Sequence, residues 1–135
     1  MTNFYFFLAC GLNTIAALLH LWVIYKGPEG YRQFGAGEGM ARMAEQGRLY
    51  PPILTLGIAS ALLFFAYLCL SQTGAVPAPP LAREILWILT GVYILRGVYP
   101  LAAYRWVPLF QSTFFVSSSV IVLGFGSVHL MAMLG

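Results

Sequence analysis

The sequence has 135 residues, of which 60% are hydrophobic and only 8% are charged, and its mean hydropathy is +0.81. Soluble domains carry about 25% charged residues, so this composition excludes an ordinary soluble domain. The net charge of +3 comes from seven basic and four acidic residues; no basic run or aromatic–basic repeat accompanies it, which argues against a nucleic-acid-binding protein. We therefore expect an integral membrane protein with a single membrane domain over residues 1–135.

Four apolar runs account for most of the chain. A helix that crosses the hydrocarbon core of a bilayer needs about 20 mostly apolar residues, and none of these runs has the period-two alternation of a barrel strand. They cover residues 4–25, 52–71, 85–104 and 113–134. The sequence thus predicts an all-α integral membrane fold, a bundle of four transmembrane helices.

The loop between the first two runs holds most of the charge. Its centre, GEGMARMAEQGR, predicts a short amphipathic helix. Glu38 and Arg42 are four residues apart, which suits an ion pair on one side of that helix. Met40, Met43 and Ala44 share another side, which we expect to rest on the membrane surface.

The distribution of Lys and Arg predicts the orientation in the membrane. Residues 26–51 and 105–112 together hold five basic residues, whereas the opposite side has Arg83 alone. Loops rich in Lys and Arg stay in the cytoplasm. We expect these two loops to be cytoplasmic and both termini to lie outside.

Arg96 lies inside the third run, in YILRGVYPL. A charge at such a depth costs about 2.5–3.5 kcal/mol on insertion scales, so the side chain needs a partner. No Asp or Glu lies in any of the four runs. One interpretation is that the Arg96 side chain reaches the phosphates of cytoplasmic lipids or pairs with another group of the protein. The other is that it binds an anion in a polar cavity. Its partner is a carboxylate of the first loop, a carbonyl freed by Pro100, or an anionic group from outside the protein.

Further polar residues are predicted near Arg96. Counting along the helices places His20 within about one turn of Arg96 in depth, and Asn13 is on the same helix face as His20. Tyr93 and Tyr99 flank Arg96 by three residues on either side. These five residues are our candidate ligand-binding site, and the alternative is a buried hydrogen-bond network that fixes the order of the helices.

Small residues predict where helices approach closely. Gly57 and Ala61 form a small-x-x-x-small pair in the second run, and the last run contains residues 117–119 (all Ser), Gly124 and Gly126. Such patterns favour helix–helix contact in membranes. We expect His129, on the same last run, to lie in a contact of this kind.

No catalytic residue, metal site or cofactor is predicted. The sequence has no Asp and no H-E-x-x-H, P-loop or G-x-S-x-G motif. Cys10 and Cys69 have no metal-binding spacing and are either small hydrophobes or a disulfide between two helices. His20 and His129 differ too much in depth to ligate one haem within one chain, so a haem would need like histidines of two copies.

The passages FGAGEGMARMAEQG, YILRG and SSSVIVLGFGSVHL resemble those of small four-span bacterial membrane proteins. This resemblance implies that the protein is located in a bacterial inner membrane, and it implies no particular activity. The leading hypothesis is a non-enzymatic binding or accessory protein that holds an anionic lipid or amphiphile near Arg96, His20 and Tyr93. The alternatives are a homo-oligomeric transporter or channel subunit, and a small enzyme with His20 as acid or base and Arg96 as anion clamp. The expected partners are membrane lipids and either further copies of the chain or a larger membrane complex.

Overall fold

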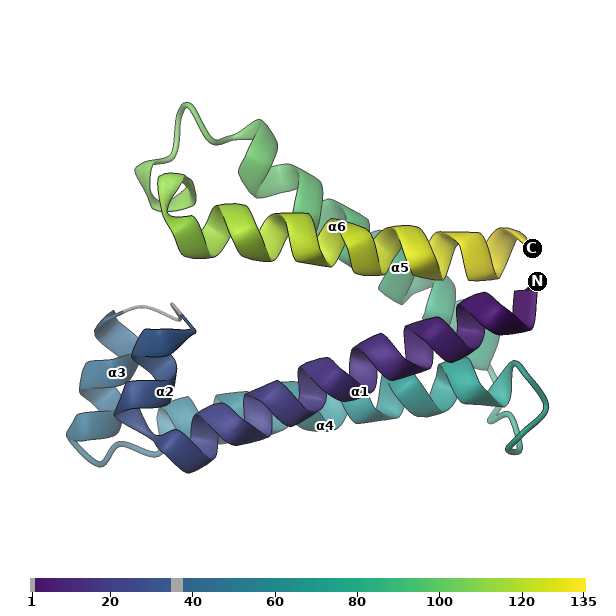
Figure 1. Cartoon of the computed structure of the whole chain (residues 1–135), viewed down its shortest axis with the longest axis horizontal. Helices are drawn as coiled ribbons and strands as arrows, with labels where there is room; N and C mark the ends of the chain where they lie inside the picture. Colours follow the sequence, from purple (N-terminus) through teal and green to yellow (C-terminus); the bar gives the residue numbers. More distant parts are fainter. Residues whose placement is uncertain (1, 35–37) are drawn as a thin grey trace. The chain divides into compact units, whose positions relative to one another are not determined.

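The computed structural model describes residues 2–34 and 38–135, and these residues form helices and no strand (Figure 1). The helices are α1 (Thr2–Lys26), α2 (Pro28–Gln33), α3 (Glu38–Glu45), α4 (Tyr50–Ser71), α5 (Ala82–Ala102), the 3-10 helix η1 (Pro108–Gln111) and α6 (Thr113–Leu134). Within the described ranges, α1, α4, α5 and α6 are long and apolar enough to cross a membrane. The all-α prediction with four such helices is confirmed at this level.

The ends of the long helices are set by backbone hydrogen bonding and not by where the apolar residues begin and end. α6 has the predicted bounds, whereas α4 begins at Tyr50, two residues early. Pro51 and Pro52 then occupy its first turn, where the missing N–H is not needed. For α5 the predicted range 85–104 was wrong at both ends. The helix begins before the polar pair Arg83 and Glu84, because backbone bonding does not stop where apolar composition does.

The chain packs as two compact units. The first unit consists of the chain up to Leu12 together with Phe65–Gly135. Its core joins the start of α1, the end of α4, the start of α5 and the end of α6. The core residues are Phe6, Ala9, Leu68, Cys69, Ala82, Leu86, Leu89, Ala132 and Met133. These are the four helix ends that we predicted on the outer side of the membrane.

Within the first unit, α5 and α6 approach each other closely. A Cβ at Gly126 of α6 would lie 2.9 Å from Cγ1 of Ile94 on α5, and a Cβ at Gly97 of α5 would lie 3.0 Å from the carbonyl oxygen of Ser119. The predicted close contact at Gly126 is confirmed. A Cβ at Gly57 or Gly124 would meet no described atom within 4 Å, so neither glycine makes a close helix contact within its own unit.

The second unit, Asn13–Phe64, packs the two short helices α2 and α3 beside the end of α1. Its core contains Val23, Tyr31 and Ala41, and Met40 and Ala44 of α3 pack against it. This side of α3 therefore contacts protein through Met40 and Ala44, and its contact with the membrane surface stays a prediction. The predicted helix at the centre of the loop is confirmed over Glu38–Glu45 and ends three residues before the predicted Arg48; Gly37, which we had included, lies outside the described residues. The sequence analysis missed α2.

A buried hydrogen bond ties α2 to the start of α4. The Thr55 hydroxyl donates to the Pro51 carbonyl at 2.7 Å, so its oxygen is left to accept from the Tyr31 hydroxyl at 3.1 Å. Tyr31 and Thr55 are both buried. The charged loop is thus held by a specific contact to a long helix and not merely by its connections.

Arg32 of α2 links this helix to α3 through ion pairs on the exposed side of the two helices. Its Nη2 lies 3.1 Å from Oε1 of Glu38 and 2.6 Å from Oε1 of Glu45. The predicted pair of Arg42 with Glu38 is confirmed at 3.6 Å. We call this group of two arginines and two glutamates the Arg32 clasp. The hydrogen bond from Arg32 is the main cause that lowers the pKa of the Glu38 carboxyl, and both glutamates raise the pKa of Arg32.

The lowered pKa of Glu38 makes the clasp sensitive to acid. A carboxylate with a depressed folded-state pKa stabilises the fold above its unfolded pKa, and this contribution disappears as the pH falls through the folded value. We expect a carboxyl NMR titration of Glu38 to have its midpoint below the ordinary Glu value of about 4.3. In Arg32→Gln the midpoint should rise towards that value; an unchanged midpoint would show that Arg32 does not cause the shift.

The close approach at Gly126 has a matched control two residues away. Gly126→Ala should lower stability by about 1–3 kcal/mol, because the added methyl group overpacks the contact with Ile94. Gly124→Ala should be neutral or stabilising by up to about 1 kcal/mol, because it replaces a helical glycine in open space. Thermal unfolding of both variants in the same detergent tests the pair, and equal melting temperatures would contradict the contact.

Candidate functional site

Arg96 of α5 bonds to the neighbouring helix α6. Its Nη1 donates to Oγ of Ser119 at 3.2 Å, and its Nη2 donates to Oγ of Ser118 at 3.1 Å. The guanidinium carbon also lies 5.4 Å from the centroid of the Phe115 ring. Arg96 is half-buried, whereas Ser119 is fully buried. Two neutral hydroxyl groups and an aromatic ring are thus its contacts within the first unit.

The pairing follows from the depth of these residues in two consecutive helices. Arg96 lies six residues before the end of α5, and Ser118 and Ser119 lie five and six residues after the start of α6. At 1.5 Å per residue, Arg96 is about 9 Å from its helix end, closer than the 12 Å that follows from the predicted end at residue 104. Sequence analysis treated the serines only as small residues. Matching their depth with that of Arg96 would have found the contact.

A groove of about 360 Å³ lies beside Arg96 at the corner between α5, η1 and α6. Its other lining residues are Val92, Leu95, Tyr99, Pro100, Phe110 and Phe115. The rings of Tyr99 and Phe110 meet edge to face with centroids 5.6 Å apart. The walls are apolar and aromatic except at Arg96 and the Tyr99 hydroxyl. The groove therefore suits a hydrocarbon chain.

Tyr93 does not line this groove, although it lies one turn from Arg96. Its ring packs edge to face on Phe125 and His129, with centroids 5.8 and 5.2 Å apart. The structure thus brings Tyr99, but not Tyr93, to the groove beside Arg96.

His129 joins three helices of the first unit and is buried. Its Nδ1 lies 2.8 Å from the carbonyl oxygen of Phe125, so Nδ1 carries the proton and donates. Nε2 is then an acceptor and faces Sγ of Cys69 on α4 at 3.6 Å. The prediction that His129 lies in a helix–helix contact is confirmed. A haem iron would have to displace this Cys69 contact to reach Nε2.

The two cysteines are thiols and not a disulfide. Both lie at the core of the first unit, Cys69 within it and Cys10 packed against it. This placement agrees with their interpretation as small hydrophobic residues. Among the described residues, no group of three or more His, Cys, Asp or Glu side chains is arranged to hold a metal ion.

Asn13 and His20 belong to the second unit. Asn13 is fully buried, and His20 is half-buried with Nδ1 at 2.6 Å from the carbonyl oxygen of Ala16. This carbonyl accepts, so His20 also carries its proton on Nδ1. The meeting of Asn13 and His20 with Arg96 stays a prediction, since the latter belongs to the first unit.

Comparisons with protein-family models, with curated proteins and with solved structures found no match to this chain. The geometry of the site is therefore the basis for inferring a function.

The contact between Arg96 and Ser119 can be tested against a neighbouring serine. Ser119→Ala removes a buried acceptor of the guanidinium and should cost about 1 kcal/mol, within the range measured for hydrogen bonds between membrane helices. Ser117→Ala is the control, because the exposed Ser117 hydroxyl bonds only to its own helix at Thr113 and Phe114. Thermal unfolding should separate the two variants, and an equal loss of stability in both would argue against the Arg96 contact.

Proposed function

We propose that this chain is an integral membrane protein that binds the anionic headgroup of a lipid or similar amphiphile at Arg96, without catalysing a reaction. It would cross the membrane four times, with residues 26–51 and 105–112 in the cytoplasm and both termini outside. A bacterial inner membrane is the proposed location, and the α2–α3 segment would lie at its cytoplasmic surface.

The exposed side chains of the four long helices support insertion in a membrane. Each of these helices has large apolar residues that are more than half exposed. The exposed fractions are, for example, 63% for Phe4, 63% for Ile53, 69% for Ile88 and 59% for Ile121. Soluble monomers rarely expose contiguous apolar surface on this scale. The alternating direction of the helices, whose four ends meet in the core of the first unit, agrees with four successive crossings.

The observation that carries the proposed binding is the lack of a carboxylate partner for Arg96 in its own unit. The only carboxylate side chain of the first unit belongs to Glu84, which lies twelve residues earlier on α5, or about 18 Å along the axis. Ser118 and Ser119 accept hydrogen bonds but do not neutralise the charge. A guanidinium has five N–H donors, and these two bonds use two of them. The remaining donors are available to a phosphate.

The adjoining groove supports an amphiphile as the ligand. Val92 and Leu95 precede Arg96 on α5 and lie towards the middle of the helix, whereas Tyr99 and Phe110 lie towards the corner with η1. A hydrocarbon chain along Val92 and Leu95 would leave its headgroup beside the guanidinium. A small polar anion would gain nothing from these apolar walls.

Native mass spectrometry tests the proposal. The protein is reconstituted in bilayers of equal parts phosphatidylglycerol and phosphatidylcholine and then released in mild detergent. We expect the wild type to retain phosphatidylglycerol, and Arg96→Ala to lose this adduct by at least about tenfold, which corresponds to about 1.4 kcal/mol. Arg105→Ala removes an exposed arginine at the same end of α5 and should keep the adduct.

A second variant separates lost binding from lost folding. Arg96→Lys keeps the charge and should retain part of the adduct, while the melting temperature of each variant reports its fold. Equal adducts in the wild type and in a folded Arg96→Ala, or no phosphate-bearing adduct in the wild type, would contradict the proposal.

A further inference from the structure

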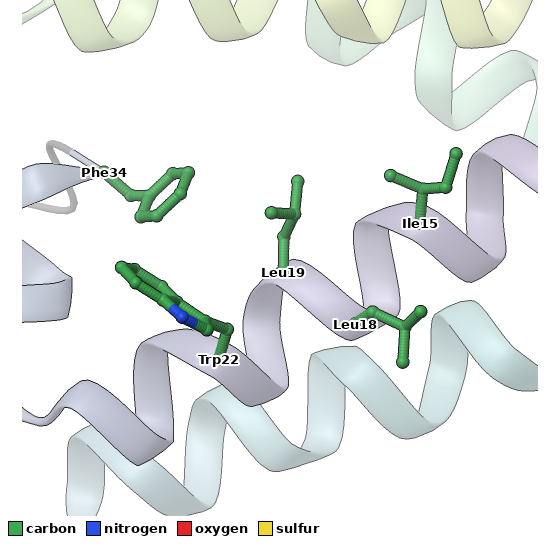
Figure 2. A pocket seen from close by; sticks show the side chains of 5 residues that line it. All are labelled: Ile15, Leu18, Leu19, Trp22 and Phe34. Carbon is green, nitrogen blue, oxygen red and sulfur yellow. The ribbon is translucent and has the colours of Figure 1, made fainter.

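A second groove, of about 470 Å³, lies on α1 in the second unit. It is lined by Ile15, Leu18, Leu19, Trp22 and Phe34, all of them apolar or aromatic (Figure 2). Each of these side chains is between 37 and 58% exposed. We call this feature the α1 groove; it shares no residue with the groove beside Arg96.

The hollow is formed because the chain folds back after α1. A single helix presents a convex surface, so a groove needs a second wall. Gly27 has a φ of 69° and lets the chain turn into α2, at whose end Phe34 lies. The Phe34 ring then meets the Trp22 ring edge to face at 5.4 Å between centroids (Figure 2). Phe34 is thereby the wall that turns the α1 surface into a groove.

A positive charge lies at the end of the groove. Lys26, the last residue of α1, is exposed, and its Nζ lies 5.4 Å from the centroid of the Trp22 ring. The ion pairs described in this unit join Arg32 and Arg42 to glutamates of the clasp and leave Lys26 out. Lys26 is thus available as a cation beside this groove.

The α1 groove and Lys26 together match half of a bilayer in length. From Ile15, at the far end of the groove, to Lys26 is eleven residues, or about 16 Å along the helix axis. The hydrocarbon core of a bilayer is about 30 Å thick, so this distance corresponds to one leaflet. With Lys26 at the interface, Trp22 would lie about 6 Å deeper and Ile15 near the bilayer centre, so an acyl chain in the groove would extend from its headgroup at Lys26 past Trp22 to Ile15.

We propose that the α1 groove holds one acyl chain of an anionic phospholipid, whose phosphate group is bound by Lys26. The apolar walls fit the chain, the lysine complements the negative headgroup, and the aromatic pair lies near the interface, where such rings are favoured. This binding site is independent of Arg96, because it uses other residues in the other unit.

Trp22 provides a direct probe of this site. The chain has three tryptophans, so Trp87→Phe with Trp106→Phe leaves Trp22 as the only one. The single-tryptophan protein is reconstituted in phosphatidylcholine vesicles that contain either brominated phosphatidylglycerol or brominated phosphatidylcholine at the same mole fraction. We expect the brominated phosphatidylglycerol to bind beside Trp22 about fivefold more strongly, as for one lysine near an anionic headgroup.

Two variants in the single-tryptophan background separate charge from shape. Lys26→Gln should abolish the preference for phosphatidylglycerol, while Lys26→Arg should keep it. Phe34→Ala removes the second wall and should weaken quenching by both lipids. Equal quenching by the two lipids in the unaltered groove, or a preference that survives Lys26→Gln, would overturn the proposal. Absence of quenching by either lipid would also overturn it, since the groove would then be closed to lipid.

Discussion

The interior of a bilayer offers no water to a polar side chain, so each such group must bond to its own helix or to a neighbouring one. Most polar residues of the long helices use the first solution: the Thr90 hydroxyl donates to the Leu86 carbonyl at 2.7 Å, and the Ser127 hydroxyl donates to the Leu123 carbonyl at 2.8 Å. Arg96 has too many donors for its own helix, and it is joined to α6 instead. The packing of α5 against α6 therefore depends on this one charge as well as on the glycines that let the helices approach.

The two histidines satisfy the same constraint with the same hydrogen bond. In both, Nδ1 donates to the carbonyl oxygen four residues earlier on the same helix, in His20 to Ala16 and in His129 to Phe125. In His129 the other ring nitrogen, Nε2, faces the Cys69 thiol in a buried core, which makes the residue a link between α4 and α6 and separates it from any ligand in the groove beside Arg96.

Features that depend on composition and short spacing could be predicted from the sequence. The four long helices follow from apolar length, and the Glu38–Arg42 pair follows from its spacing. The packing of α2 against α4 could not be predicted, because it depends on the fit of Tyr31 against Thr55, 24 residues later. The serine partners of Arg96 were predictable but were not predicted, because a carboxylate, a freed carbonyl or an external anion was expected in their place. The mainly apolar groove beside Arg96 was not predicted, since the rings of Phe110 and Phe115 come from segments whose packing has no local signal.

If the protein is inserted in a membrane as proposed above, the distance in sequence between Arg96 and its acceptors has a consequence for its biogenesis. Ser118 and Ser119 follow Arg96 by 22 and 23 residues and lie on the next helix to be synthesised. If α5 partitioned into lipid on its own, it would carry an unbonded guanidinium at a cost of about 2.5–3.5 kcal/mol. Leaving the insertion machinery together with α6 avoids this cost, because the serines then accompany the arginine. The last two helices are therefore expected to enter the bilayer as a hairpin, and the order of translation becomes part of how the charge is tolerated.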